Sequence, residues 1–454
     1  MNGLRRTGAH RPAAVQPSLT TPGDFSGMER RVIASLALPA AVAATFMVLA
    51  ALWLGGQAEL YRRVLMLWGV APFAFPFLDI HGVLASLQCS AQGIDVYTAN
   101  PCDALGRVFF YSPLLLWLTS TGIGATATPV AGLIIDAVFI ASLALLPAPR
   151  RPRDRLLLLC AAVSSTVALG LERANIDMLI FAIVVIAARL LARGIAARVG
   201  AYALIAAAAL LKFYPVVLFV LALREQTRIF VAVAAAAAAA FAIFVAAYHA
   251  ELMLALGNVP HDKWFQDLFG ARNLPYGLAA LGVGAAPGLL LSAMMVAAGA
   301  GALMLGAWRG TEAYSRLTTL EATCLVAGAV LIVGCFFAGQ SFVYRSVFLL
   351  LTLPGLTTMA RDAGTSRART FFATVAGMVV LLMWEEAFRR AVVAAAPQAL
   401  LAFWICRELA WWTTMAVLGG ILVRFVRSAE IVGSMSGWHA AQVGVALRRR
   451  FSAR

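Results

Sequence analysis

The stretch FFAGQSFVYRSVFLLL, Phe336–Leu351, contains the pattern that decides the fold. One apolar segment ends near Gln340, a short polar turn follows, and a second apolar segment begins near Tyr344 and Arg345. Apolar segments joined by a turn are typical of helices that cross a membrane, because a helix satisfies its backbone hydrogen bonds internally in lipid. The stretch therefore predicts two membrane-spanning helices with polar side chains at their shared end.

The whole chain repeats this pattern. Its 454 residues are 62% hydrophobic and 13% charged, with a mean hydropathy of +0.86, whereas soluble proteins average about 25% charged residues. The apolar segments are too long and too continuous for the alternating strands of a membrane barrel. We therefore predict an all-α polytopic membrane protein with about 12 transmembrane helices, which cover approximately residues 32–54, 127–147, 156–171, 178–193, 199–211, 213–223, 228–248, 286–307, 318–337, 344–359, 371–388 and 405–425.

The distribution of charge predicts the orientation of these helices, because cytoplasmic loops of membrane proteins collect Arg and Lys. The opposite, outer side holds 12 of the 21 acidic residues and the two longest loops, 55–126 and 249–285. The chain then divides into a basic cytoplasmic tail (1–31), a transmembrane domain (32–425) and a second basic cytoplasmic tail (426–454). Seven connections hold 25 of the 36 basic residues and are predicted to be cytoplasmic: 1–31, 148–155, 189–198, 224–228, 308–317, 360–370 and 424–454.

The net charge of +15 has the same origin, so we predict a lipid bilayer and no nucleic acid as partner. High Ala and only two Lys indicate a GC-rich bacterial genome. The predicted location is the bacterial cytoplasmic (inner) membrane, with the chemistry facing the periplasm or the outside.

Val64–Leu78 is apolar enough for a further span, but because it contains Pro72 and Pro76 we expect a re-entrant or interfacial segment.

The first outer loop carries the main candidate for chemistry, Asp79. It follows the rigid segment that contains Pro76 and precedes the amphipathic stretch Ile80–Gln92. A partly desolvated carboxylate at a membrane interface is suited to act as a general base. The alternative is a structural Asp that caps a helix over Ile80–Gln92. Further along this loop, Arg107 suits either a phosphate or the lipid headgroups.

The stretch GLERANIDMLIF, Gly170–Phe181, places four polar side chains in one outer hairpin between two short spans: Glu172, Arg173, Asn175 and Asp177. One interpretation is ion pairing within the hairpin. The other is a substrate path, because polar groups at membrane depth are costly and commonly functional. Asp136, inside the second predicted span, needs a partner or a proton.

Two cations interrupt the apolar segments on the outer side. Lys212 precedes Pro215 in ALLKFYPVVLF, and Arg345 opens a span. Both suit an anionic group such as a phosphate, with snorkelling to the membrane surface as the alternative for Lys212. A further group is expected to form a solvated ion-pair cluster at a helix end: Glu385, Glu386, Arg389 and Arg390.

Cys89 and Cys102 lie in the first outer loop, 13 residues apart, where an oxidising compartment favours a disulfide. The Cys and His residues show no zinc-site spacing, and the glycines form no nucleotide-binding pattern. We therefore predict no structural zinc, no metal ligands among the named residues and no cofactor. The many acidic residues on the outer side leave a divalent metal open, although no ligand set is evident.

In combination, these motifs resemble a known family. An outer Asp in the first large loop, in DIHGVLASLQCSAQGIDVY, is similar to glycosyltransferases of the GT-C fold. The ERANID hairpin, the LKFYP break and the turn near QSFVYR resemble glycosyltransferase family 87, which includes polyprenyl-phosphate-mannose-dependent mannosyltransferases. The resemblance covers approximately residues 60–425. It implies a GT-C-like bundle and transfer of a hexose, with a lipid-linked sugar as substrate rather than cofactor.

The resemblance also implies roles for individual residues. Asp79 is expected to deprotonate an acceptor hydroxyl for direct, inverting attack on the donor sugar, with an envelope glycan or glycolipid as acceptor. Lys212, Arg345 and Arg173 are expected to hold the lipid phosphate. The sugar or acceptor is expected to contact Glu172, Asn175, Asp177, Tyr344 and Asn273, the last in ARNLPYGL, which resembles the family's loop into a later span.

The family's mannosyltransferases tend to carry histidines where this chain has Tyr344 and Arg345, so the donor sugar stays open. The alternative functions are a transporter or flippase of lipid-linked saccharides and an envelope scaffold. Transporters place polar residues at mid-depth in repeated halves, whereas the polar groups here gather on one face. An enzyme is expected to have a cavity across which Asp79 faces Lys212 or Arg345.

Overall fold

The computed structural model describes residues 23–259, 268–283 and 286–429. Over these residues the chain is a multi-pass helical membrane protein, as predicted. Nine helices in the described part of the chain are long and apolar enough to cross a membrane. A tenth span forms if α5 and α6, which are bent by 43° at a short break, count as one.

The helices follow one another with short connections, and the only strands in the described chain are two residues long. The α-helices are α1 (Gly23–Leu54), α2 (Ala58–Leu67), α3 (Leu78–Ala91), α4 (Thr128–Ser142), α5 (Pro152–Ala162), α6 (Ser165–Arg173), α7 (Ile176–Leu191), α8 (Ile195–Lys212), α9 (Thr227–Gly257), α10 (Asn273–Ala280), α11 (Pro287–Ala307), α12 (Thr319–Ala338), α13 (Leu349–Asp362), α14 (Ser366–Met383), α15 (Glu385–Ala395) and α16 (Leu400–Ser428). The 3₁₀ helices are η1 (Pro113–Thr121), η2 (Ala125–Ala127), η3 (Leu143–Leu145), η4 (Tyr214–Arg224), η5 (Arg309–Arg316), η6 (Val343–Phe348) and η7 (Pro397–Ala399), and β1 (Leu268–Phe269) pairs antiparallel with β2 (Ser341–Phe342).

Each of the twelve predicted segments coincides with a helix or a bent pair of helices. Two of them, α7 with 16 residues and η4 with 11, are not among the candidate spans. The predicted number of about 12 spans is therefore higher than the nine or ten that helix length supports. The helix boundaries also differ from the prediction. Helix α1 already begins at Gly23, and α9 extends to Gly257, well into the predicted 249–285 loop. The remaining parts of the predicted tails, 1–22 and 430–454, lie outside the described residues.

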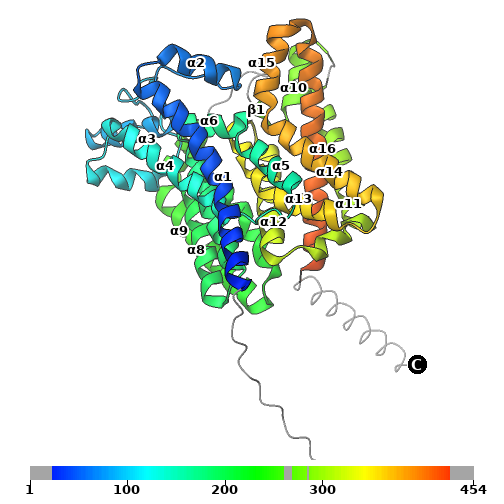
Figure 1. Ribbon diagram of the computed structural model, residues 1–454. Coiled ribbons are helices and arrows are strands. Elements are labelled where there is room, and N and C mark those ends of the chain that lie inside the picture. The colour runs from blue at the N-terminus through cyan, green and yellow to red at the C-terminus, as the bar shows by residue number, and fades with distance from the viewer. Residues whose placement is uncertain (1–22, 260–267, 284–285, 430–454) are drawn as a thin grey trace, which may run out of the picture.

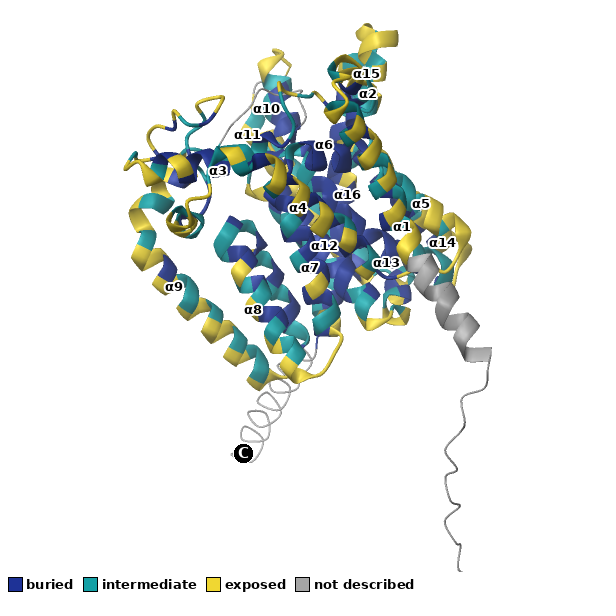
Figure 2. Ribbon diagram, turned by 60° about the vertical axis from the view of Figure 1, so that its left-hand side comes forward, coloured by how far each residue is buried: buried dark blue, intermediate teal, exposed yellow. Residues whose placement is uncertain are grey.

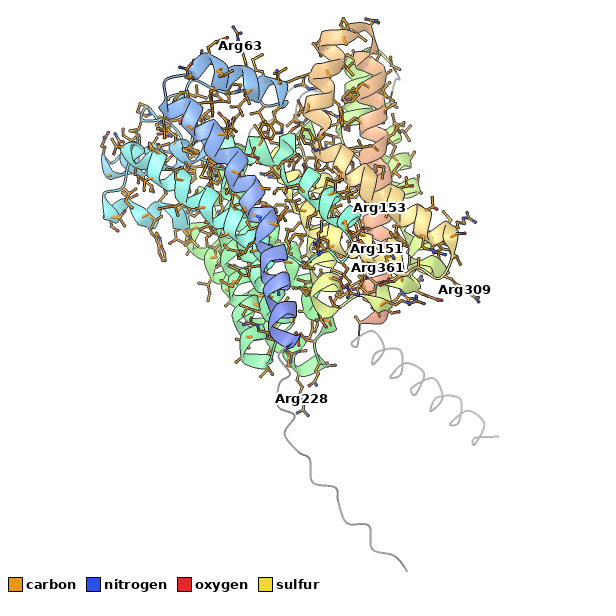
Figure 3. All side chains as sticks on the ribbon, viewed as in Figure 1. Arg63, Arg151, Arg153, Arg228, Arg309 and Arg361 are labelled. Carbon is orange, nitrogen blue, oxygen red and sulfur yellow. A yellow bond between two sulfur atoms is a disulfide. The ribbon has the colours of Figure 1, made fainter. Side chains whose placement is uncertain are left out.

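The helices run between two ends of the bundle (Figure 1). One end carries α2, α10 and α15, and we call it the Asp79 end because α3 also lies toward it. Helix α1 begins, and α16 finishes, at the opposite end. Arg63 lies at the Asp79 end, whereas Arg228 and Arg309 lie toward the opposite end (Figure 3). The orientation in the membrane stays a prediction.

Burial separates inner helices from those that face the surroundings (Figure 2). Over an 18-residue apolar stretch of each span, 67% of the residues are buried in α12 and 78% in Val343–Asp362, whereas only 6% are buried in α9 and in α11. Helices α12 and α13 therefore form the centre of the bundle. Helices α9 and α11 expose apolar side chains, which is expected of surfaces that face lipid.

The break between α5 and α6 shows how the fold tolerates irregular backbone at membrane depth. Carbonyl groups freed at a helix end need partners in a water-poor environment. The Trp68 indole donates to the Val163 carbonyl at 2.8 Å, and the Trp384 indole donates to the Cys160 carbonyl at 2.8 Å. Val64–Leu78 is not a spanning helix, because α2 ends at Leu67 and α3 begins only at Leu78.

Candidate active site

Asp79 lies in the first turn of α3 and does not cap that helix. The N-cap position belongs to Phe77, which has a left-handed backbone (φ 66°) and makes no side-chain capping bond. The Phe77 N–H donates instead to the Glu172 carbonyl at 2.6 Å. The helix that carries Asp79 is thus attached to the α6–α7 turn, and the interpretation of Asp79 as a capping residue is wrong.

The Asp79 carboxylate contacts both an amide and two guanidinium groups. Its Oδ2 accepts a hydrogen bond from Asn175 Nδ2 at 2.6 Å. Its Oδ1 lies 3.5 Å from Arg107 NH1 and 3.8 Å from Arg173 NH1. These two distances are at or beyond the limit of an ordinary hydrogen bond, so Oδ1 keeps the capacity to accept a proton from another group.

Arg107 is held in place mainly by Asp103. Its Nε and NH2 donate to the Asp103 carboxylate at 3.0 and 2.9 Å, and NH2 also donates to the Leu78 carbonyl at 2.7 Å. Burial acts to raise the pKa of Asp103, but the hydrogen bonds from Arg107 outweigh it and hold the pKa below its usual value. Arg107 therefore binds within the protein, at the start of α3, rather than lipid headgroups.

The ERANID hairpin forms the centre of the site. Ala174 adopts a left-handed backbone (φ 44°) that ends α6 and starts the turn into α7. Asn175 then caps α7, because its Oδ1 accepts from the Asp177 N–H at 2.9 Å. The same Oδ1 accepts from Lys212 Nζ at 3.0 Å, while the Asn175 amide donates to Asp79. One buried asparagine thereby connects the carboxylate of α3 with the cation of α8.

Asp177, Lys212 and Arg345 form a buried ionic cluster, which we call the Asp177 cluster. Asp177 Oδ1 lies 2.7 Å from Lys212 Nζ, and Oδ2 lies 3.4 Å from Arg345 Nε. The Tyr214 hydroxyl donates to Oδ1 at 2.7 Å, and Arg345 NH1 donates to the Ser341 hydroxyl at 3.0 Å. Two cations surround one carboxylate, so the cluster has an excess of positive charge.

Three residues next to the site have a strained backbone conformation. Among the described residues, only Phe77, Ala174 and Phe213 are non-glycine residues with positive φ. Phe77 starts the helix of Asp79, Ala174 separates Arg173 from Asn175, and Phe213 directly follows Lys212. Such conformations cost about 1–3 kcal/mol each and cluster at functional sites. Sequence reasoning missed this feature because Phe and Ala carry no signal for positive φ.

A cavity of about 330 Å³ borders the Asp177 cluster. Lys212 Nζ lies over the rings of Tyr111 and Tyr344, 5.5 and 5.9 Å from their centroids. Burial, followed by the charge of Asp79, raises the pKa of Tyr111 well above its usual value. The lining of this cavity comes from the loop before η1, the α8–η4 break, the end of α9 and the α12–η6 turn: Phe110, Tyr111, Lys212, Phe213, Tyr214, Leu256, Val259, Cys335, Ala338, Gly339, Gln340, Ser341, Phe342, Tyr344 and Arg345.

Several predicted site residues lie beside this cavity rather than in its lining. Asp79 reaches Lys212 only through Asn175, so it does not face Lys212 directly across the cavity. Arg173 stacks on Phe73, 4.1 Å from the ring centroid, and its Nε lies 3.0 Å from Glu172 Oε2. The structure thus brings Arg173 to Asp79 rather than to Lys212 and Arg345.

Asn273 and the first-loop cysteines also lie outside the cavity lining. Asn273 is buried, donates to the Leu268 carbonyl at 3.0 Å and accepts from Gln340 Nε2 at 3.4 Å. It therefore meets the cavity only through Gln340. Cys89 and Cys102 form a disulfide that closes the loop between α3 and Asp103.

Asp136 is buried in α4, and neither of its carboxylate oxygens accepts a hydrogen bond within the described chain.

The two acids of the charged group at α15, Glu385 and Glu386, are buried, whereas Arg389 and Arg390 are half-buried. The expected ion pair is present between Arg389 and Glu386, but the expectation that the acids are solvated is wrong. Arg407 from α16 reaches Glu408 Oε1 at 2.6 Å, Glu386 Oε1 at 3.7 Å and the Leu268 carbonyl at 3.3 Å. Burial is the main cause that raises the pKa of Glu385 to about 8. The error arose because α15 packs against α16 and buries the acids of its first turn. We call this group the Arg407 cluster: Glu385, Glu386, Arg389, Arg407 and Glu408.

Within residues 23–259, 268–283 and 286–429, no three His, Cys, Asp or Glu side chains gather in a way that could hold a metal ion. Comparison with known proteins gave no match: no family model, no curated protein and no solved structure matches this chain.

Proposed function

We propose that the protein is a membrane glycosyltransferase that transfers a hexose from a polyprenyl-phosphate-linked donor to an envelope glycan or glycolipid. In this proposal the Asp79 end faces the periplasm or the outside of a bacterial inner membrane. The observation that carries the proposal is the continuous chain of contacts from Asp79 through Asn175, Lys212 and Asp177 to Arg345. It connects a carboxylate suited to proton transfer with cations that border a cavity.

The cations supply the donor site. A polyprenyl phosphate glycoside carries an anionic phosphate, and charge-assisted hydrogen bonds to Lys and Arg are the strongest that proteins offer such a group. The Asp177 cluster has one positive charge in excess, and its Lys212 and Arg345 line the cavity. As the phosphate leaves the sugar its negative charge grows, and fixed cations in a water-poor site stabilise that change.

The carboxylate supplies the proton acceptor. The acceptor hydroxyl loses its proton to Asp79 Oδ1 while its oxygen forms a bond to the anomeric carbon. The bond between that carbon and the phosphate oxygen breaks, and the polyprenyl phosphate departs with the electron pair. Asn175 holds Oδ2 at 2.6 Å and so orients Oδ1 toward the acceptor. A single displacement of this kind inverts the anomeric carbon.

The depth of the site favours an enzyme over a transporter of lipid-linked saccharides. Lys212 is the last residue of α8, Asp177 lies in the first turn of α7, and Arg345 lies in η6, just before α13. All three thus lie where their helices end, at the Asp79 end of the bundle. A transporter needs its binding site near mid-depth, between halves that alternate in access.

The test is transfer from a radiolabelled polyprenyl-phosphate hexose in membranes that contain the full chain. Asp79→Asn keeps the size of the side chain and removes the base, so transfer is expected to fall by about 10²–10⁴-fold. The matched control is Asp95→Asn, an exposed aspartate in the same loop region, which is expected to retain parental transfer. Thermal unfolding of both variants after purification verifies that they are folded. Equal transfer by Asp79→Asn and the parent would remove the proposed base.

A further inference from the structure

A second large cavity lies at the Asp79 end, and the lining residues of the two cavities are entirely different. It has a volume of about 460 Å³, which is within the roughly 300–1,000 Å³ range of ligand sites. Ala50 and Trp53 of α1 and Leu133 of α4 contribute apolar walls, and Phe77 closes one side. Its wall therefore includes the strained residue that starts the helix of Asp79.

The cavity borders the surface that faces the bilayer. Next to its walls, Met47 and Val48 of α1 are 64% and 60% exposed, and Val130 and Ile134 of α4 are 62% and 58% exposed. Large apolar side chains with this exposure on two candidate spans are expected to contact lipid. An apolar chain in the bilayer thus has a short route into the space between α1 and α4.

The polar part of the lining offers hydrogen-bond acceptors. The Thr128 hydroxyl donates its one proton to the Ala125 carbonyl at 2.6 Å. His81 Nδ1, 3.1 Å from the same hydroxyl oxygen, must therefore be the donor in that contact. Burial lowers the pKa of His81, so the ring is neutral at pH 7. Its Nε2 is then an acceptor, and it has no hydrogen-bond partner within the described chain.

Glu172 adds a second acceptor at this end. It lines the cavity and is 2% exposed. Arg173 Nε lies 3.0 Å from its Oε2, and no other described side chain donates a hydrogen bond to either carboxylate oxygen. Among the sixteen lining residues, all within the described chain, none is Lys or Arg. The polar end therefore suits a hydroxyl donor and disfavours a phosphate or a carboxylate.

We propose that this cavity binds an uncharged lipid with a hydroxyl-bearing head group, whose apolar chain lies between α1 and α4. The hydroxyl lies toward His81 and Glu172, and the chain contacts Ala50, Trp53 and Leu133. This site is distinct from the cationic cavity, and the proposal does not depend on glycosyl transfer.

The experiment uses the full chain in vesicles of phosphatidylethanolamine and phosphatidylglycerol. A trace of monoacylglycerol with a diazirine in its acyl chain is the probe, and crosslinked peptides are mapped by mass spectrometry. We expect saturable labelling of peptides that contain residues 46–54 and 125–133. Ala50→Phe fills the cavity and is expected to lower this labelling roughly tenfold. Ala44→Phe, at an exposed position on the same helix, is the matched control and is expected to leave labelling unchanged.

Two further arms make the result decisive. Ala125→Phe fills the cavity from the opposite wall, so the test survives if Ala50→Phe fails to fold. The matched diazirine fatty acid has the same chain with an anionic head, and a diazirine polyprenyl phosphate represents the donor. Labelling that neither cavity-filling variant lowers, equal labelling by the fatty acid, or labelling by the polyprenyl phosphate in place of the monoacylglycerol would each overturn the proposal. None of these readouts requires transferase activity.

Discussion

Two buried ionic clusters lie at the Asp79 end of the molecule, and they differ in the ratio of carboxylates to cations among the described residues. The Asp177 cluster surrounds one carboxylate with two cations and borders a cavity. Within the described part of the chain, the Arg407 cluster has three carboxylates for two cations, and Arg407 also donates to the Leu268 carbonyl. The Asp177 cluster thus has more cations than carboxylates and borders a cavity. The Arg407 cluster contributes no residue to the lining of either cavity described above.

The pKa of Glu385 explains how the second cluster tolerates its extra acid. Burial raises that pKa to about 8, so Glu385 is neutral at pH 7, and among the described residues two charged acids then face two cations. In the part of the chain that the structure describes, the Asp177 cluster has no second acid in direct contact with its two cations, because Asp79 reaches Lys212 only through Asn175. A charge that the protein leaves unbalanced is available to a ligand of opposite sign. We therefore interpret the first cluster as a binding site and the second as a structural anchor.

The largest effect is expected from Arg407→Met. It leaves the Glu408 carboxylate buried without the cation that lies 2.6 Å away. Removing one partner of a buried ion pair typically costs about 3–5 kcal/mol, so the free energy of unfolding is expected to fall by that amount in chemical denaturation of purified protein. Arg63→Met, which breaks the exposed Arg63–Glu59 pair, is the control and is expected to cost about 0–1 kcal/mol. An equal cost for the two variants would contradict the assignment of the Arg407 cluster as an anchor.

Lys212→Met is expected to act on the ligand instead of the fold. Asp177 keeps Arg345 at 3.4 Å and the Tyr214 hydroxyl, so no buried charge is left uncompensated. The donor phosphate loses a charge-assisted hydrogen bond of about 1.5–3 kcal/mol. The KM for the polyprenyl-phosphate hexose is therefore expected to rise by roughly ten- to a hundredfold, with a small change in the unfolding free energy. An unchanged KM would place the phosphate elsewhere.

The sequence could predict the helical membrane fold and most of the first cluster. Hydropathy locates spans because each helix must satisfy its backbone in lipid, and polar residues such as Asp177, Lys212 and Arg345 stand out against an apolar background. Such residues are costly at membrane depth, so their presence alone indicates a function.

The second cluster could not be predicted in the same way. Glu385 and Glu386 begin a helix with high polarity, which looks the same in sequence whether that face meets water or α16. The pairing of Asp103 with Arg107 could not be predicted either, because it depends on a loop that returns to the start of α3. Tertiary packing, which local sequence does not encode, decides these cases.

Glu385→Gln tests the charge balance of the Arg407 cluster through pH. The folded-state pKa of about 8 lies above the ordinary value of 4.5, so between these values the folded state binds more protons than the unfolded state. The parent is then expected to lose stability relative to Glu385→Gln as pH rises from about 5 to 8, by at most about 1.4 kcal/mol per unit. Parallel unfolding free energies of the two proteins across this range would show that Glu385 is ionised throughout.

The smallest effect is expected at the joint between the two clusters. Arg407 holds the Leu268 carbonyl of β1, β1 pairs with β2, and Ser341 of β2 accepts a hydrogen bond from Arg345 NH1 at 3.0 Å. Ser341→Ala removes that acceptor and is expected to cost about 1 kcal/mol in stability. The KM for the donor is expected to rise about threefold, because Arg345 keeps Asp177 but loses one positioning contact.

Ser292→Ala, at an exposed serine of α11 whose hydroxyl donates to the Gly288 carbonyl, is the matched control and is expected to leave the KM unchanged. A rise of a hundredfold in Ser341→Ala would mean that β2 alone positions Arg345. No change at all would mean that Asp177 alone does so, and that the Arg407 cluster stabilises the fold without any influence on the donor site. An intermediate effect is what a guanidinium shared between a buried carboxylate and a short strand requires, since each partner fixes a different nitrogen of the same group.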